Sequence, residues 1–135
     1  MAKLYTDGAC RGNGGIDSLA GAGAIIYDKD DNILAEISEF LGKGKTNNIA
    51  EYRAMLLGLE RSLDLGINTI YIYTDSKLIV KQVKGEWRVK DFKLIPLHKE
   101  LKDLLKKFEE WDITHIYRNY NKEADKLANL AIDNR

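Results

Sequence analysis

The chain has 135 residues, of which 44% are hydrophobic and 31% are charged, and its 21 basic side chains balance 21 acidic ones. This composition is that of a globular domain. It excludes a disordered chain and a membrane-embedded one, because no stretch approaches the roughly 18 apolar residues of a membrane span. We expect one domain covering residues 1–135, without a signal peptide, since a strand-like pattern begins at Lys3. The single cysteine, Cys10, excludes an internal disulfide and fits a cytoplasmic setting.

The charge is distributed unevenly along the chain. Residues 77–107 contain ten basic and four acidic side chains, a net charge of +6, so the remaining residues carry −6. A basic region beside an acidic one suits a protein that contacts phosphates with one part and holds metal cations with another. The alternative is a solvated helix face, which the spacing of Lys99, Lys102 and Lys106 also fits. The charge pattern alone does not choose between the two.

The first half of the chain reads as three strands and a helix. Strand-like patterns cover residues 3–10, 22–28 and 33–41, and the glycine-rich and Asp/Asn-rich segments between them predict hairpins. Residues 48–65 then carry leucine and alanine at helical spacing, and Gly66 marks the end of that helix.

The second half alternates strands with helices. We expect a strand over 69–74, a short helix over 76–84, a helix that begins near Pro96, a strand over 113–117 and a closing helix over 121–132 capped by Asn121. The element order βββαβααβα predicts an α/β fold, with a mixed five-stranded sheet flanked by helices.

The triplet Tyr-Thr-Asp occurs twice, ending in Asp7 and in Asp75. If the two strands are neighbours, both aspartates lie on one face, roughly 5 Å apart. Carboxylates so close repel each other unless a cation lies between them, which indicates a metal site. Either aspartate taken alone is equally well explained as the residue that ends a strand.

Two further acids lie in first turns of predicted helices. Glu51 shares a helical stripe with small and apolar residues, where a carboxylate needs a partner, but 48–51 also has the spacing of a capping box. Asp125 is favoured by the dipole of the last helix whether or not it binds anything. Together the four acids, with no histidine or cysteine cluster, suit two Mg²⁺ or Mn²⁺ ions and not zinc.

Four segments, in this order, resemble the type 1 ribonuclease H family, and the resemblance spans nearly the whole chain. They are residues 6–15 (TDGACRGNGG), 46–52 (TNNIAEY), 73–76 (YTDS) and 121–129 (NKEADKLAN). The resemblance implies an endonuclease that hydrolyses the RNA strand of RNA–DNA hybrids by a two-metal-ion mechanism, leaving 5′-phosphate and 3′-hydroxyl ends. It also implies that the catalytic, metal-binding acids are Asp7, Glu51, Asp75 and Asp125.

The resemblance further implies a set of substrate contacts. Minor-groove contacts to ribose 2′-hydroxyls would come from Asn13, Asn47, Asn48 and Gln82. The DNA strand would be held by Thr46 at a phosphate and by Trp87 beside the backbone. A short segment with Arg88, Lys90 and Lys93 stands where bacterial members often carry a longer basic insertion.

The region before Asp125 departs from the family pattern. Many members have a glycine-flanked histidine there, whereas His115 lies in a strand-like stretch without glycine. Arg118 lies closer to the last helix, so we expect it at the edge of the catalytic site. The alternative is a surface ion pair between Arg118 and Glu123.

Two other functions remain open: an inactive hybrid-binding module, and a relative on the same fold that acts on duplex DNA, such as a junction resolvase or a transposase-like enzyme. The presence of all four acids disfavours the first. The minor-groove asparagines implied by the resemblance favour hybrid over duplex DNA. We expect a monomer that needs no membrane and no obligate protein partner.

Overall fold

The computed structural model describes residues 1–12 and 15–135 and contains one five-stranded sheet with the strand order β3-β2-β1-β4-β5. In chain order the elements are β1 (Ala2–Arg11), β2 (Leu19–Tyr27), β3 (Ile33–Lys43), α1 (Asn47–Asp64), β4 (Thr69–Thr74), α2 (Lys77–Val83), α3 (Ile95–Leu105), β5 (Glu110–His115), the 3₁₀ helix η1 (Arg118–Tyr120) and α4 (Lys122–Asp133).

The sheet is mixed, as the element order predicts. β1 lies at its centre, antiparallel to β2 and parallel to β4, and β5 extends the parallel part beside β4. β2 begins at Leu19, three residues before the expected start, because its alanine- and glycine-rich first residues pair with the end of β1. The predicted fold class is therefore confirmed.

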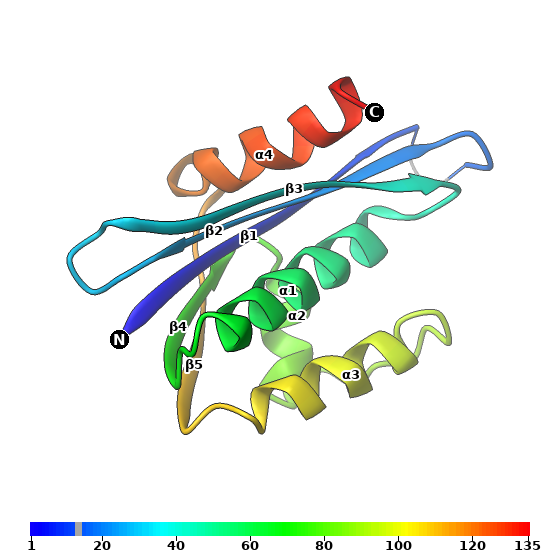
Figure 1. Cartoon of the computed structure of the whole chain (residues 1–135). Coiled ribbons are helices and arrows are strands. Elements are labelled where there is room, and N and C mark those ends of the chain that lie inside the picture. Colours follow the sequence, from blue (N-terminus) through cyan, green and yellow to red (C-terminus); the bar gives the residue numbers. More distant parts are fainter. Residues whose placement is uncertain (13–14) are drawn as a thin grey trace.

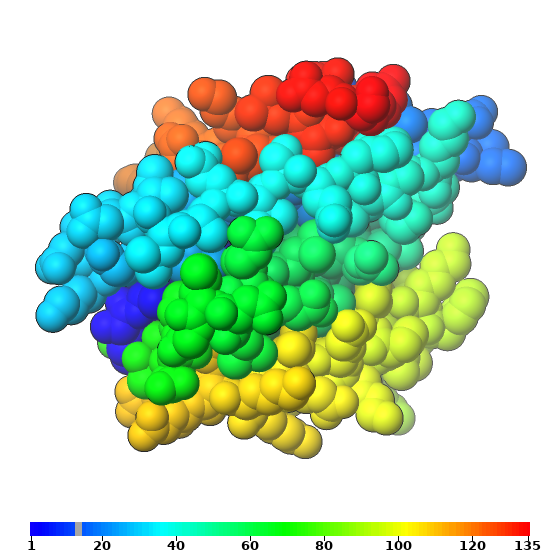
Figure 2. Space-filling model, in the orientation of Figure 1, coloured from blue at the N-terminus to red at the C-terminus, as the bar shows by residue number. Residues whose placement is uncertain are grey.

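Helices cover both faces of the sheet. Figure 1 shows α4 on one face and α1, with α3 beyond it, on the other. In the space-filling view the edge strand β3 forms a band between α4 and α1 (Figure 2). Between the sheet and α1, side chains such as Leu4, Ile72 and Leu59 are fully buried. Burial of each such side chain stabilises the fold by about 1.5–3 kcal/mol, so this layer is the main core.

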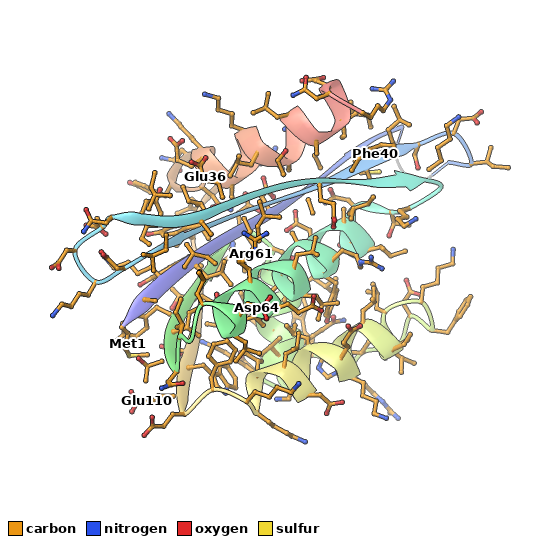
Figure 3. The ribbon with its side chains drawn as sticks, viewed as in Figure 1. Met1, Glu36, Phe40, Arg61, Asp64 and Glu110 are labelled. Atoms are coloured by element: carbon orange, nitrogen blue, oxygen red, sulfur yellow. The ribbon has the colours of Figure 1, made fainter. Side chains whose placement is uncertain are left out.

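The strand β3 forms an open edge of the sheet. Its labelled residues Glu36 and Phe40 lie along this edge in Figure 3, and Phe40 is 37% exposed. Within the described residues, no helix is both long and apolar enough to cross a bilayer.

The chain before α4 differs from the expectation. The last strand ends at His115 and not at residue 117, because its neighbour β4 ends at Thr74, the residue that pairs with His115. A turn of 3₁₀ helix follows, which the sequence pattern did not predict. Asn121 takes the N-cap position of α4, but its side chain makes no capping bond. It is buried against β1, where its Nδ2 donates to the Thr6 carbonyl at 2.9 Å.

Candidate active site

The two Tyr-Thr-Asp triplets lie side by side. Tyr5 pairs with Tyr73 and Thr6 with Thr74 across the parallel ladder between β1 and β4. The ladder therefore brings Asp7 and Asp75 to the same end of the two central strands, as the repeated triplet predicts. Asp7 is 4% exposed, and Asp75 is half-buried just beyond the end of β4.

Glu51 is directed at the same place from α1. The helix is capped by Thr46, whose Oγ1 accepts from the Ile49 N–H at 3.2 Å, so a capping box on Asn48 does not form. The Glu51 carboxylate instead accepts from the Gly8 N–H at 3.1 Å. A Cβ on Gly8 would lie 2.4 Å from the Ala50 carbonyl carbon, so only glycine lets β1 approach the helix this closely.

Three carboxylates thus share one small space. Asp7, Glu51 and Asp75 each offer an oxygen, and these oxygens lie within 4.8 Å of one another. Burial, and then the charge of Glu51, raise the pKa of Asp7. Burial also raises the pKa of Glu51, while a hydrogen bond with Asp7 opposes that rise. Without a cation, the cluster keeps a proton in order to reduce the repulsion between its charges.

The donor set fits a hard divalent cation. Within the described part of the chain, Glu51 Oε2 and Asp75 Oδ2 are buried and have no hydrogen-bond partner. A buried carboxylate oxygen without a donor is costly, and a cation satisfies it. All the ligand atoms are carboxylate oxygens, the type that Mg²⁺ and Mn²⁺ prefer.

Asp125 lies beside the three clustered acids, but its carboxylate is not part of the group whose oxygens lie within 4.8 Å of one another. It is half-buried in the first turn of α4, where it helps to raise the pKa of Asp7, and its Oδ1 accepts from Asn129 Nδ2 at 3.2 Å. α4 can lie this close to the sheet because β2 has glycine opposite Asp7: a Cβ on Gly23 would lie 2.2 Å from the Ala124 carbonyl oxygen.

Arg118 and His115 occupy different positions around the cluster. Arg118 lies in the exposed η1 turn, and its positive charge contributes to lowering the pKa of Glu51. An Arg118–Glu123 ion pair is not among those that the described residues form. His115 is exposed at the end of β5, with its ring edge-on to Tyr117 at 5.8 Å.

The expected substrate contacts fall into two groups. Asn47 and Asn48 are exposed in the first turn of α1, next to Thr46. The second group lies around a groove of about 560 Å³ after α2, lined by Gln82, Gly85, Glu86, Trp87, Arg88, Val89, Ile95 and His98. Lys90 is exposed just beyond this groove, and Asn13 lies outside the described residues.

Sequence reasoning missed several residues that build the site. Gly8 and Gly23 allow the two helices to approach, and Asn121 ties α4 to β1. His98 lines the groove, where its Nε2 contacts the Gln82 carbonyl at 3.2 Å. The alternation of glycine and alanine over residues 20–24 is the one signal that could have indicated close packing on both faces of β2.

Comparison with known proteins decides the family. A family model described as "Reverse transcriptase-like" matches residues 6–131. The ribonuclease HI of Halobacterium salinarum is 40% identical over 129 residues, which are 96% of this chain and 63% of that protein. The solved structure of RNase H1 from Halobacterium salinarum superposes with a TM-score of 0.93 and 39% identity, covering 99% of this chain and 98% of that one.

The chain belongs to the type 1 ribonuclease H family. It thus spans just under two thirds of the Halobacterium protein's length. Another ribonuclease H, LC11-RNase H1, has been solved in complex with an RNA/DNA hybrid. It superposes with a TM-score of 0.91 at 34% identity, over 99% of this chain and 98% of that chain. The carboxylate cluster therefore lies in a ribonuclease H fold for which a hybrid-bound relative is known.

Proposed function

We propose that this chain is an endonuclease that hydrolyses the RNA strand of RNA–DNA hybrids and leaves 5′-phosphate and 3′-hydroxyl ends. The observation that carries the proposal is the cluster of Asp7, Glu51 and Asp75, whose buried oxygens include two without a donor. Such clustered carboxylates destabilise the fold. A metal-dependent hydrolase needs them to bind its metal ions, whereas a module that only binds nucleic acid does not. Membership of a family with a hybrid-bound relative supports the choice of substrate.

The four acids Asp7, Glu51, Asp75 and Asp125 would hold two Mg²⁺ or Mn²⁺ ions. When bound, such ions supply Lewis acidity for attack by water and for departure of the leaving oxygen. The protein positions the acids from four places in the fold: β1, α1, the residue after β4, and α4. The Gly8 N–H orients Glu51, and the Asn129 amide orients Asp125, so both carboxylates are preorganised for cations.

Arg118 would contribute a permanent positive charge at the scissile phosphate. Its positive charge acts on Glu51 and the residue is exposed, so its guanidinium is available to a bound phosphate. A guanidinium stays protonated near neutral pH, so it can orient the phosphate or stabilise developing negative charge but cannot shuttle a proton.

The remaining residues would hold the hybrid. Asn47 and Asn48, with Asn13 and Gln82, would contact ribose 2′-hydroxyls in the minor groove. The Thr46 hydroxyl accepts a helix N–H through its oxygen, which leaves its proton free to donate to a DNA phosphate. Trp87 and Arg88, which line the groove after α2, and the nearby Lys90 would contact the backbone of the DNA strand.

We also propose that the enzyme acts as a cytoplasmic monomer. One copy of the chain supplies all four acids and the groove, so no second copy is needed to complete the site. Cys10 is a free thiol that contacts the Lys45 carbonyl at 3.2 Å, which is compatible with a reducing compartment.

A cleavage assay tests the function. A labelled hybrid, the matching DNA duplex and single-stranded RNA are incubated with Mg²⁺, with Mn²⁺ and with chelator. We expect metal-dependent cuts in the RNA of the hybrid alone, and Asp7→Asn or Asp75→Asn should lower the rate at least about 100-fold. Asp64→Asn is the matched control, because Asp64 lies exposed at the far end of α1 (Figure 3). Cleavage of duplex DNA, or full activity of Asp7→Asn, would contradict the proposal.

A further inference from the structure

Tyr52 carries a hydroxyl group into the main core. It follows Glu51 in α1, is fully buried and packs among the apolar side chains beneath the sheet. A buried tyrosine hydroxyl needs a hydrogen-bond partner, because an unpaired one loses its water without compensation. In the described part of the chain its partner is the side-chain oxygen of Gln82, Oε1, on α2.

Gln82 connects this buried contact to the groove after α2. It is 6% exposed and lines the groove together with Trp87 and Arg88. Its backbone carbonyl is also held in place, by His98 Nε2 at 3.2 Å and by the Gly85 N–H at 3.2 Å. The backbone at the base of the side chain is therefore held, and the amide can face Tyr52 with its oxygen or with its nitrogen.

The hydroxyl of Tyr52 decides that orientation. With Oε1 facing the phenol, the hydroxyl proton has an acceptor, and the amide nitrogen of Gln82 is the end left for the groove. With the amide reversed, the nitrogen would donate to the phenol oxygen, and the hydroxyl proton would lose its acceptor on Gln82. The first arrangement gives the buried Tyr52 hydroxyl its acceptor.

We propose that Tyr52 is a positioning residue that fixes the Gln82 amide so that it presents a donor, and not an acceptor, to the substrate. Gln82 then selects an acceptor in the minor groove of the hybrid, the ribose 2′-oxygen of one nucleotide. The inference rests on the proposed function, because it names the chemistry by which one residue of that site recognises the hybrid.

The test uses Tyr52→Phe, which removes the hydroxyl and keeps the ring, together with Gln82→Met and the double variant. Tyr71→Phe is the control, because Tyr71 is 39% exposed and lies in β4, outside the site. Each protein is assayed on a uniform hybrid and on hybrids with one 2′-deoxynucleotide moved stepwise along the RNA strand. The Gln82 side-chain amide signals of the free proteins are followed by NMR.

We expect Tyr52→Phe to raise KM about three- to ten-fold, the value of one hydrogen bond, with kcat within about twofold. Tyr52→Phe should also lose sensitivity to 2′-deoxy substitution at one nucleotide, and Gln82→Met should lose it at the same nucleotide. The double variant should behave like Gln82→Met alone. The Gln82 amide signals should shift in Tyr52→Phe and stay unchanged in Tyr71→Phe.

An unchanged KM and 2′-deoxy profile in Tyr52→Phe would overturn the inference and leave Tyr52 as a core residue, as would additive effects in the double variant. Failure of the proposed function appears separately, in a wild-type protein that does not cleave the hybrid. In that case the selection of hybrid acceptors falls too, and the NMR shift still decides whether Tyr52 orients the amide.

Discussion

Among the carboxyl groups of the described residues, that of Asp7 has its pKa raised furthest from its ordinary value. Its pKa is raised first by burial and then by Glu51 and Asp75, so the folded, metal-free protein holds a proton there that the unfolded chain releases near pH 4. The stabilisation from that proton is fully present below about pH 4 and is lost as the pH rises toward the raised pKa of the folded state. The free energy of unfolding of the metal-free protein should therefore fall as the pH rises from acidic to mildly alkaline values.

Asp7→Asn should remove this pH dependence. In chelator at pH 8 we expect its Tm to exceed that of the wild type by roughly 2–8 °C, and at pH 4 the two should agree, because the wild-type carboxyl is then neutral as well. Saturating Mg²⁺ should raise the wild-type Tm more than that of the variant. Thermal melts at several pH values measure this, and parallel pH profiles for the two proteins would refute the explanation.

At the same scale, Arg118 and His115 can be separated by their effects on turnover. Arg118→Ala should lower kcat about 10- to 100-fold, because a charge beside Glu51 is lost from the site. His115→Ala should change kcat less than about threefold, because its ring lies against Tyr117 at the end of β5. Single-turnover rates on one hybrid provide the comparison. A large loss in His115→Ala with a normal Arg118→Ala would reverse the two roles.

At the level of elements, the position of α4 determines whether Asp125 reaches the cluster. Among the contacts that dock this helix, two lie near its start: the close approach at Gly23, opposite Asp7, and the bond from Asn121 to the Thr6 carbonyl. Both act on the first turn of α4, which carries Asp125. The distance between Asp125 and Asp7 is therefore set by backbone packing and not by the acids themselves.

Gly23→Ala should displace α4. Its Cβ would meet the Ala124 carbonyl oxygen at 2.2 Å, so the variant should lose about 3 kcal/mol of stability and most of its activity, and it should bind Mg²⁺ more weakly. Gly66→Ala is the matched control, because Gly66 has φ +80° with open space around it and should cost only about 1 kcal/mol of backbone strain. Urea unfolding and calorimetric metal titration measure both. Equal losses in the two variants would show that the packing of α4 on β2 is not tight.

At the scale of the whole molecule, the proposed function assigns the basic region, residues 77–107, to binding the polyanionic hybrid. Neutralising Arg88, Lys90 and Lys93 together should raise KM more than it lowers kcat, and each lost phosphate contact should reduce the slope of log K against log salt by roughly 0.9. The control, with the same change of charge, replaces three exposed lysines by glutamine: Lys99 in α3, and Lys106 and Lys107 just after it. Binding isotherms at several salt concentrations decide. An equal effect of both triple variants would mean that only net charge matters.

The sequence predicts the fold class of this protein and part of its carboxylate cluster. The element order and the alternation along each strand predict the mixed sheet, and the repeated Tyr-Thr-Asp triplet predicts that Asp7 and Asp75 meet. These predictions rest on patterns along single strands and helices. The fold keeps such patterns because a strand or helix turned the other way would expose its apolar face. For Glu51 and Asp125 the sequence could not distinguish a metal ligand from an ordinary acid near a helix start, since the first turn of a helix favours a carboxylate with or without a partner.

Tertiary structure decided what depends on contacts between distant segments. It placed the cap of α1 on Thr46, freed Glu51 to accept from Gly8, and turned the Asn121 side chain from capping α4 to binding β1. It also ended β5 at His115, because a strand at a sheet edge stops where its neighbour stops. The sequence indicated the four candidate acids and the strands and helices that carry or precede them. Only the packed backbone decided which donors those residues find, because a hydrogen bond depends on the three-dimensional position of both partners.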